Sequence, residues 1–349
     1  MSERLAREIR ENGPLGFDRF MAAALYDPQH GYYAGRRGQV GRAGDFFTSV
    51  SVGPLFGHLL ARHLVAFWEE IGRPERWRIL EVGAHEGQLA ADILAALPEL
   101  DATAAGAVEH AIVEPLPSLA AAQRERLGER VTIVGAPGDL DPLPGMLIAN
   151  EVLDALPCHL VESTGDGWIE LGVGFDDGFQ WVPLGPAGEL AENLPRRPAG
   201  YRTEVRRGLD EFLRGFLPAL APCRMLWIDY GYERDDYYAE GRVEGTLRTF
   251  SRHRAGDDPL DAPGSRDISA HVDFTSLREA TEASGGEVMR FENQGRFLTK
   301  IARPWLLSLE GRTDAARSLR QFQTLTHPGQ LGSRFHVMEA AWRTAPLCE

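Results

Sequence analysis

The sequence contains little cysteine and no long hydrophobic run. Its three cysteines, Cys158, Cys223 and Cys348, are isolated from one another in a chain of 349 residues. An odd, scattered set fits neither a disulfide scaffold nor a metal cluster, so we expect reduced thiols and no metal site. No stretch approaches the roughly 18 apolar residues of a membrane-spanning helix, so we also expect no membrane partner.

Basic charge is scarce as well. Lysine and arginine number 37 against 51 acidic residues, which gives a formal net charge of -14. Binding to nucleic acid without sequence preference depends on neutralising phosphates with basic side chains, so this balance argues against a nucleic-acid partner. An acidic surface favours a basic partner instead, such as an arginine-bearing protein segment.

The remaining composition is that of a globular protein in solution. Hydrophobic residues make up 43% of the chain and charged residues 25%, which are ordinary fractions for that class. The length predicts one large or two modest domains. The first twenty residues alternate charged and apolar groups and lack the apolar core of a signal peptide, so we expect a cytoplasmic location.

The stretch from Arg78 to Leu94 organises the expected fold. A short apolar run stops at Gly83, which is typical of a buried parallel strand. After Gly87, apolar residues recur at helical spacing. A helix that begins beside a strand end presents free backbone N–H groups to a ligand, so the stretch predicts a nucleotide-cofactor loop. A tight turn without any ligand is the alternative at this point.

The glycine spacing favours a methyl donor over a dinucleotide. The pattern is Glu81-x-Gly83-x-x-x-Gly87, and His85 stands where the dinucleotide fingerprint has its middle glycine. S-adenosylmethionine carries no phosphate, so a site for its amino acid and adenosine groups tolerates this change. We expect His85 itself to be an exposed loop residue rather than a catalytic base.

A second predicted strand, residues 107–114, ends in an acid. A carboxylate accepts two hydrogen bonds from a diol, so Glu114 is a candidate for binding a ribose. Glu114 follows Gly83 at more than the roughly twenty positions of a dinucleotide fold, and we interpret the alanine-rich tract 98–106 as an insertion. The alternative is that Glu114 is a solvated acid before Pro115.

Polar residues also follow a later strand, residues 146–149. The alternation of strands and helices predicts a doubly wound parallel sheet with ligands at the carboxyl ends of its strands. Asn150, Glu151 and Asp154 lie just past such an end, where they suit a cation or a guanidinium. The alternative is a helix N-cap formed by Asn150, with Glu151 interacting with the helix dipole.

The rest of the chain predicts a helical N-terminus and a long inserted region. We expect four consecutive segments: a helical cap with a cofactor-covering loop (1–72), a core (73–184), an insertion with a lid (185–285) and a completion of the core sheet (286–349). The expected elements are helices at 2–12, 17–25, 55–71, 274–284 and 301–326, a hairpin at 160–184, a helix capped by Thr203, a lid at 231–273, and strands at 224–230, 287–291 and 335–341.

With these pieces placed, the chain resembles the MidA family of S-adenosylmethionine-dependent methyltransferases, which includes the mitochondrial complex I assembly arginine methyltransferase. The resemblance extends over most of the chain in motifs that follow the family order. They lie at residues 26–28 and 31–33, 44–49, 54–57, 81–87, 150–151 and 154–157, 228–231, 245–248, 267–268 and 270–274, and 332–338.

The resemblance implies a fold and a set of site residues. The fold is the α/β class I methyltransferase fold, a Rossmann-like sheet of seven strands with the last antiparallel, helices on both faces, an N-terminal helical cap and an inserted substrate region. The residues implied at the S-adenosylmethionine cofactor are Gly44, Asp45, Thr48, Glu81, Gly83, Ala84, Gly87, Glu114 and Asn150, with Glu151 and Asp154 facing the methyl acceptor.

One segment departs from the family pattern. The family usually has Glu-x-Gly-Pro-Gly-Arg-Gly. This chain has Ala84, His85 and Glu86 in place of the proline, the middle glycine and the arginine. The change bears on the cofactor pocket and on the substrate, although Glu81, Gly83 and Gly87 suffice for the turn.

Three functions follow as hypotheses. The leading one is methylation of an arginine guanidinium on a partner protein, with Glu151 and Asp154 as a carboxylate clamp. The second is methylation of a small molecule at oxygen, nitrogen or carbon, with His253 or His271 as the general base. The third is an assembly factor that binds the cofactor without catalysis. The oligomeric state is open, with a homodimer as one option.

Overall fold

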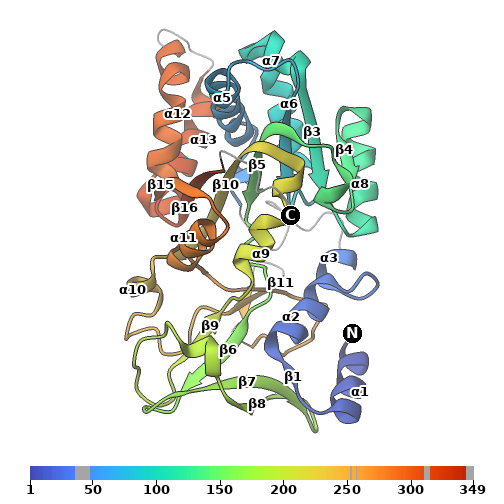
Figure 1. The fold of residues 1–349 in the computed structure, drawn as a ribbon, viewed down its shortest axis with the longest axis vertical. Helices are drawn as coiled ribbons and strands as arrows, with labels where there is room; N and C mark the ends of the chain where they lie inside the picture. Colours follow the sequence, from blue (N-terminus) through green and yellow to red (C-terminus); the bar gives the residue numbers. More distant parts are fainter. Residues whose placement is uncertain (36–47, 252–253, 257, 310–314, 343–349) are drawn as a thin grey trace. The chain divides into compact units, whose positions relative to one another are not determined.

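The computed structural model describes residues 1–35, 48–251, 254–256, 258–309 and 315–342 (Figure 1). The chain divides into two compact units, each assembled from separate segments. We call Met1–Arg36, Leu153–Leu209 and Tyr232–Ser276 the accessory unit, and Arg37–Val152, Asp210–Gly231 and Leu277–Glu349 the sheet unit. The expected segments 1–72, 73–184, 185–285 and 286–349 divide the chain at other positions, because each unit takes up stretches that are far apart in sequence.

The sheet unit is built on a mixed sheet with the strand order β15-β16-β10-β5-β2-β3-β4. Neighbouring strands from β10 to β4 are parallel, whereas β16 is antiparallel to both β10 and β15. This order confirms the predicted class I sheet with an antiparallel last strand. The strands are β2 (Trp77–Val82), β3 (Val108–Val113), β4 (Thr132–Val134), β5 (Leu143–Asn150), β10 (Leu220–Tyr232), β15 (Glu287–Asn293) and β16 (Phe335–Trp342).

Helices cover both faces of this sheet. Alternate residues of β10 point to opposite faces, so Leu226 joins the main core while Trp227 meets the rings of Phe212 and Phe216 on the other face. The helices of the unit are α4 (Ser49–Val52), α5 (Leu55–Glu70), α6 (Gln88–Leu100), α7 (Ala102–Ala107), α8 (Pro117–Leu127), α9 (Leu209–Arg214, whose first residue falls in the accessory unit), α11 (Phe274–Ala283, which begins in the accessory unit), α12 (Gln294–Ser308) and α13 (Ala316–Thr326), with the short turns η1 (Gly128–Arg130), η2 (Pro137–Asp139), η4 (Leu217–Ala219) and η5 (Pro328–Gly332).

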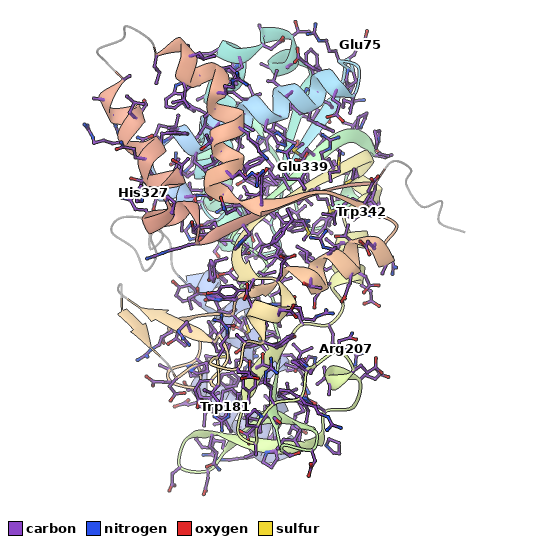
Figure 2. All side chains as sticks on the ribbon, turned by 90° about the vertical axis from the view of Figure 1, so that its left-hand side faces the viewer. Glu75, Trp181, Arg207, His327, Glu339 and Trp342 are labelled. Carbon is purple, nitrogen blue, oxygen red and sulfur yellow. The ribbon has the colours of Figure 1, made fainter. Side chains whose placement is uncertain are left out.

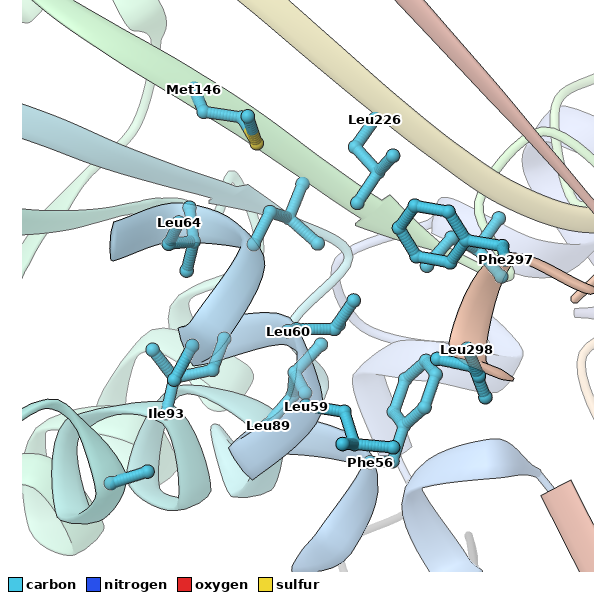
Figure 3. Packing of buried hydrophobic residues seen from close by; sticks show 14 of the residues in the cluster. Phe56, Leu59, Leu60, Leu64, Leu89, Ile93, Met146, Leu226, Phe297 and Leu298 are labelled. Carbon is cyan, nitrogen blue, oxygen red and sulfur yellow. The ribbon is translucent and has the colours of Figure 1, made fainter. Parts of the chain in front are cut away.

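The main core lies between the sheet and α5, α6 and α12. Figure 3 shows side chains from these three helices gathered over two strands of the sheet. Burying large apolar side chains of this kind supplies the dominant favourable free energy of folding. The labelled members are Phe56, Leu59, Leu60 and Leu64 of α5, Leu89 and Ile93 of α6, Met146 of β5, Leu226 of β10, and Phe297 and Leu298 of α12.

The accessory unit packs the N-terminal helices on a small antiparallel sheet. Phe17 and Phe20 of α2 are fully buried, in a cluster with Leu160 and Val173 of the sheet. The strand order is β1-β7-β6-β9, with β8 paired to β7, and a second small sheet has the order β12-β11-β13. The elements are α1 (Ser2–Asn12), β1 (Leu15–Gly16), α2 (Phe17–Tyr26), α3 (Tyr32–Gly35), β6 (His159–Ser163), β7 (Trp168–Phe175), β8 (Phe179–Pro186), η3 (Gly188–Ala191), β9 (Arg202–Val205), α10 (Arg234–Tyr237), β11 (Arg248–Ser251), β12 (Arg254–Gly256), β13 (Asp267–Ser269) and β14 (Val272–Asp273).

Three local expectations can be compared with the structure. Thr203 does not cap a helix but lies in β9, whose β-branched residues pair with β6, and the helix begins only at Leu209. The tract 98–106, which we interpreted as an insertion, is mostly helical, because α6 continues to Leu100 and Asp101 then caps α7 through the N–H groups of Thr103 and Ala104. The hairpin expected at 160–184 forms, with the three strands β6, β7 and β8 joined by turns at 164–167 and 176–178. Within the described residues, no helix is both long and apolar enough to cross a membrane.

Candidate functional site

The turn between β2 and α6 depends on its two glycines. Gly83 and Gly87 have φ values of 69° and 79°, a left-handed conformation that side chains disfavour. A Cβ atom on Gly83 would lie 2.5 Å from a methyl group of Val152, and one on Gly87 would lie 2.7 Å from a methyl group of Leu127. The turn therefore fits closely against the residues after β5 and against α8, with Gly87 as the N-cap of α6.

His85, between these glycines, also has a left-handed backbone, with φ 48°. Its side chain is half-buried, and this burial lowers the pKa of its imidazole. The expectation of an exposed loop residue is therefore wrong for His85. Its neighbour Ala84 is buried, and the carbonyl oxygen of Ala84 accepts the N–H of Gly87 at 2.7 Å.

Glu114 is a buried acid directly after β3. Glu114 is only 7% exposed, which contradicts the alternative of a solvated acid. Burial raises the pKa of Glu114, while hydrogen bonds from the N–H of Leu116 and from Gln123 act to lower it. Oε1 accepts the Leu116 N–H at 2.9 Å and Oε2 accepts Nε2 of Gln123 at 3.0 Å. Each carboxylate oxygen has two lone pairs, so both retain capacity to accept a diol.

The turn after β5 is held by neighbouring strand β10. Glu151 has φ 55° and donates its backbone N–H to the carbonyl oxygen of Ile228 at 2.8 Å. Oε1 of Glu151 accepts Nδ2 of Asn150 at 3.0 Å. In the described chain no helix begins at Asn150, since the next regular element is β6 at His159, so the helix N-cap alternative is wrong.

Asp229 is a residue that holds this turn and that we did not predict as a site residue. It lies in β10, has no exposed surface, and accepts the N–H groups of Val152 at 3.1 Å and Tyr230 at 2.9 Å. Its carboxylate thus fixes the backbone directly after Glu151. The signal in the sequence is an acid that interrupts the apolar run 225–228 of a buried strand.

Two further cofactor candidates are placed by the structure. Glu81 is 3% exposed in β2, and its Oε2 lies 3.5 Å from Nε2 of the buried His110 in β3. Thr48 caps α4, because its hydroxyl accepts the N–H of Ser51 at 3.1 Å. Gly44, Asp45 and His253, which were also predicted as site residues, lie outside the described residues.

Asp154 and His271 belong to the accessory unit, where Arg206 connects their backbones. Its guanidinium donates to the carbonyl oxygens of Asp154 at 2.9 Å and His271 at 2.6 Å. Asp154 is 6% exposed, and its carbonyl oxygen also accepts the N–H of Ala270 at 3.0 Å. Burial, with Arg242, Arg248 and Arg206 nearby, lowers the pKa of His271 to about 4, so this imidazole is neutral near pH 7.

One group in the accessory unit has the residue types of a metal site. Asp18, His159 and Glu170 each offer a ligand atom, and these atoms lie within 4.8 Å of one another. Nδ1 of His159 and Oε1 of Glu170 are 2.8 Å apart, which is a hydrogen-bond distance. That hydrogen bond accounts for their closeness without an ion.

The residues of the sheet unit fit S-adenosylmethionine. Oδ1 of Asn150 is buried and has no hydrogen-bond partner among the described residues, so it can accept a hydrogen bond from an ammonium group. Glu114 can accept the ribose hydroxyls, and the glycine turn allows close approach of a ligand to the backbone. The strand order, this turn and the acid after β3 together define a class I methyltransferase.

Comparison with known families agrees with this class. The family model of S-adenosyl-L-methionine-dependent methyltransferases named Methyltransf_28 matches residues 59–292, and the chain belongs to this family. A crystal structure of a COG1565 superfamily member from Burkholderia thailandensis, bound to S-adenosyl-homocysteine, superposes with a TM-score of 0.87 at 33% identity and covers 98% of this chain and 92% of that chain. The native crystal structure of a COG1565 superfamily protein from the same organism gives a TM-score of 0.85.

Curated relatives extend over nearly the whole chain. The mitochondrial protein arginine methyltransferase NDUFAF7 homolog of Drosophila melanogaster is 29% identical over 379 residues, covering 97% of this chain and 84% of the relative. The Homo sapiens protein arginine methyltransferase NDUFAF7, mitochondrial, is 27% identical and covers 96% and 82%. The predictions of a methyltransferase and of S-adenosylmethionine as its cofactor are confirmed.

Proposed function

We propose that this methyltransferase methylates an arginine side chain of a partner protein. The curated relatives that cover most of this chain are named protein arginine methyltransferases, which supports a guanidinium acceptor. The observation that carries the proposal is Glu151, a carboxylate at the carboxyl end of β5 whose backbone is fixed by a hydrogen bond to β10. A carboxylate pairs with a guanidinium through charged, frequently bidentate hydrogen bonds.

For methyl transfer the protein has to align the two reactants and stabilise their charge. S-adenosylmethionine supplies an electrophilic methyl group on a sulfonium. A guanidinium nitrogen would form the new N–C bond while the C–S bond breaks and its bonding pair stays on sulfur. The proton that this nitrogen loses would pass to solvent water. Glu151 would orient the acceptor and stabilise the positive charge of the guanidinium during transfer.

Asp154 is the proposed second carboxylate of the clamp. It follows Glu151 by three positions, and its backbone is anchored by Arg206 and Ala270 within the accessory unit. This anchoring leaves the segment 154–156 well defined within its own unit. We propose that both acids contact the acceptor, and that the protein acts in the cytoplasm.

The proposal is tested with Glu151→Gln, which removes the charge and keeps the shape. Cell lysate incubated with labelled S-adenosylmethionine and wild-type protein should contain a labelled protein band, with methylarginine identified by mass spectrometry. The variant should lose this transfer while its affinity for S-adenosylhomocysteine stays within about tenfold, or about 1.4 kcal/mol. Glu125→Gln, at an exposed position of α8, is the matched control. An equal loss of transfer and of cofactor affinity would place Glu151 at the cofactor instead.

Methylation of a small molecule is the second candidate. Its candidate proton acceptor is His271, whose half-buried imidazole is neutral near pH 7 and has a ring lone pair in that form, but whose pKa of about 4 makes it a weak base. Label confined to the small-molecule fraction, together with loss of transfer in His271→Asn, would support this function over methylation of a protein.

A further inference from the structure

We propose that Gln123 is a positioning residue that couples the ribose-binding acid to the glycine turn, so that both ends of the methyl donor are bound by one connected structure. The inference rests on the proposed role of Glu114 at the ribose. Gln123 lies on α8, between the two parts of the site in space although it belongs to neither motif in sequence.

One amide group makes both connections. Nε2 of Gln123 donates to Oε2 of Glu114 at 3.0 Å and to the backbone carbonyl oxygen of His85 at 2.8 Å. Both partners are acceptors, so the NH2 side of the amide must face them and both of its hydrogens are used. Gln123 has no exposed surface, and within the described residues its Oε1 has no hydrogen-bond partner. A glutamine buried with an unsatisfied oxygen is costly, which indicates that the two donated hydrogen bonds are what the site requires.

The strained backbone at His85 requires a stabilising contact from outside the turn. A non-glycine residue with left-handed backbone is strained, and this chain has His85 where the methyltransferase pattern has a glycine. The hydrogen bond from Gln123 fixes the carbonyl group of that residue. One helical turn further along α8, Leu127 packs at the site where a Cβ on Gly87 would lie. The helix α8 thus contacts the turn at two places, one polar and one apolar.

The hydrogen bond from Gln123 to Glu114 also favours the ionised form of this acid. Burial favours the neutral form of this acid, whereas donors from Leu116 and Gln123 favour the carboxylate. The carboxylate is the form with lone pairs for both ribose hydroxyls. Gln123 therefore orients the acid and keeps it ionised at the same time.

The first test compares Gln123→Leu with Glu114→Gln in the full-length protein by calorimetry with S-adenosylhomocysteine. Each variant should bind the ligand about ten- to a hundredfold more weakly, as expected for the loss of a buried hydrogen bond to a charged group. The double variant should bind S-adenosylhomocysteine only slightly more weakly than the single variant with the lower affinity. The reason is that both changes act on the same contact between Glu114 and the ribose. Fully additive losses would show that Gln123 acts on its own and would overturn the coupling.

The second test uses the pH dependence of Gln123→Glu, which a purely structural role would not change. A carboxyl at this position donates a hydrogen bond only when protonated, and the neighbouring Glu114 raises its pKa. Affinity for S-adenosylhomocysteine should therefore fall as the pH rises. In the wild-type protein it should rise with pH through the pKa of Glu114, because the ionised form binds the ribose. Ala121→Glu adds the same charge at an exposed position of α8 and should keep the wild-type profile.

The outcomes separate this inference from the assignment of Glu114 to the ribose, and none of them depends on the methyl acceptor. If Glu114→Gln weakens binding while Gln123→Glu keeps the wild-type affinity and pH profile, Gln123 has no positioning role. If Glu114→Gln itself binds like the wild-type protein, the ribose assignment is wrong and the inference fails with it. The expected result is that the affinity of the wild-type protein for S-adenosylhomocysteine rises with pH while that of Gln123→Glu falls and Ala121→Glu keeps the wild-type profile. This result would support both the ribose assignment of Glu114 and the positioning role of Gln123.

Discussion

The carboxylate of Asp229 accepts the backbone N–H of Val152 at 3.1 Å, across 77 positions of sequence. The same carboxylate accepts the N–H of Tyr230 at 2.9 Å. These two hydrogen bonds hold the residue after Glu151 against the end of β10. The direction of the Glu151 side chain thus depends on an acid that contributes nothing to its local sequence motif.

Asp229→Asn should disturb this turn. The amide has one acceptor where two N–H groups point, so one buried N–H faces a donor and the protein should lose about 1–3 kcal/mol of stability. Affinity for S-adenosylhomocysteine and the rate of methyl transfer should both fall, because the turn after β5 carries Asn150, which we expect at the cofactor, and Glu151, which we propose binds the acceptor. Thermal unfolding and calorimetry measure the two effects. Asp235→Asn, at an exposed position, should change neither.

Gly83→Ala should weaken cofactor binding and stability together. The added methyl group meets Val152 at 2.5 Å, and the backbone at φ 69° disfavours any side chain, so we expect a loss of about 1–3 kcal/mol. Adding Val152→Ala should restore only the part due to the clash. Gly106→Ala, in α7 with open space around its Cβ, should be neutral or stabilising in a melting experiment. Equal effects at both glycines would contradict the role of the left-handed turn.

Glu339 forms a buried ionic cluster on β16, where Figure 2 labels it. Its carboxylate lies 3.3 Å from His63, 3.4 Å from Arg224 and 3.5 Å from Arg290. Glu339→Gln removes the carboxylate that Arg224 and Arg290 share, while Arg224 keeps Glu70 and Arg290 keeps Glu292 as partners. We expect a loss of about 1–3 kcal/mol in the free energy of unfolding at neutral pH.

The same cluster predicts a dependence of stability on pH. Burial raises the pKa of Glu339, but His63, Arg290 and Arg224 outweigh it and hold that pKa below its usual value. A lowered pKa in the folded state gives stability that is present above about pH 4.5 and is lost as the pH falls through the folded value. Denaturant titrations from pH 7 to pH 3 should show the wild-type and Glu339→Gln curves converging. Parallel curves would mean that the cluster does not govern acid stability.

Arg206→Lys should separate acceptor chemistry from cofactor binding. The guanidinium donates to four carbonyl oxygens of the accessory unit, those of Asp154, Leu156, Ala270 and His271. A lysine ammonium cannot span four carbonyls in this planar arrangement. Methyl transfer should therefore fall at least about tenfold, a loss of about 1.4 kcal/mol, while affinity for S-adenosylhomocysteine stays near the wild-type value.

Arg207→Lys is the matched control for this change. Arg207 is labelled in Figure 2, has an exposed side chain and pairs with the exposed Glu189. Surface ion pairs of this kind contribute little, so the control should retain transfer and stability. Loss of cofactor affinity in Arg206→Lys alone would show that the cofactor site depends on the accessory unit.

Local patterns in the sequence were sufficient for the strand, turn and helix around Gly83 and for the fold class. Alternating and helical spacings reflect which side of an element is buried, so β2, α6, β3 and β5 could be predicted without tertiary information. The helix expected after Thr203 does form, but its start was wrong, because residues 202–205 pair with β6 and the helix begins only at Leu209. The discontinuous units depend on contacts between distant segments, whereas β8 forms a local hairpin with β7.

The sequence by itself determined the glycine turn after β2, the acid after β3 and the polar residues after β5, because each follows from residues that are neighbours in the chain. Tertiary structure decided what holds them in place. Gln123 reaches His85 across 38 positions, and Asp229 reaches Val152 across 77. No local pattern encodes such contacts, since they exist only when the folded sheet brings separate strands and helices within hydrogen-bond distance.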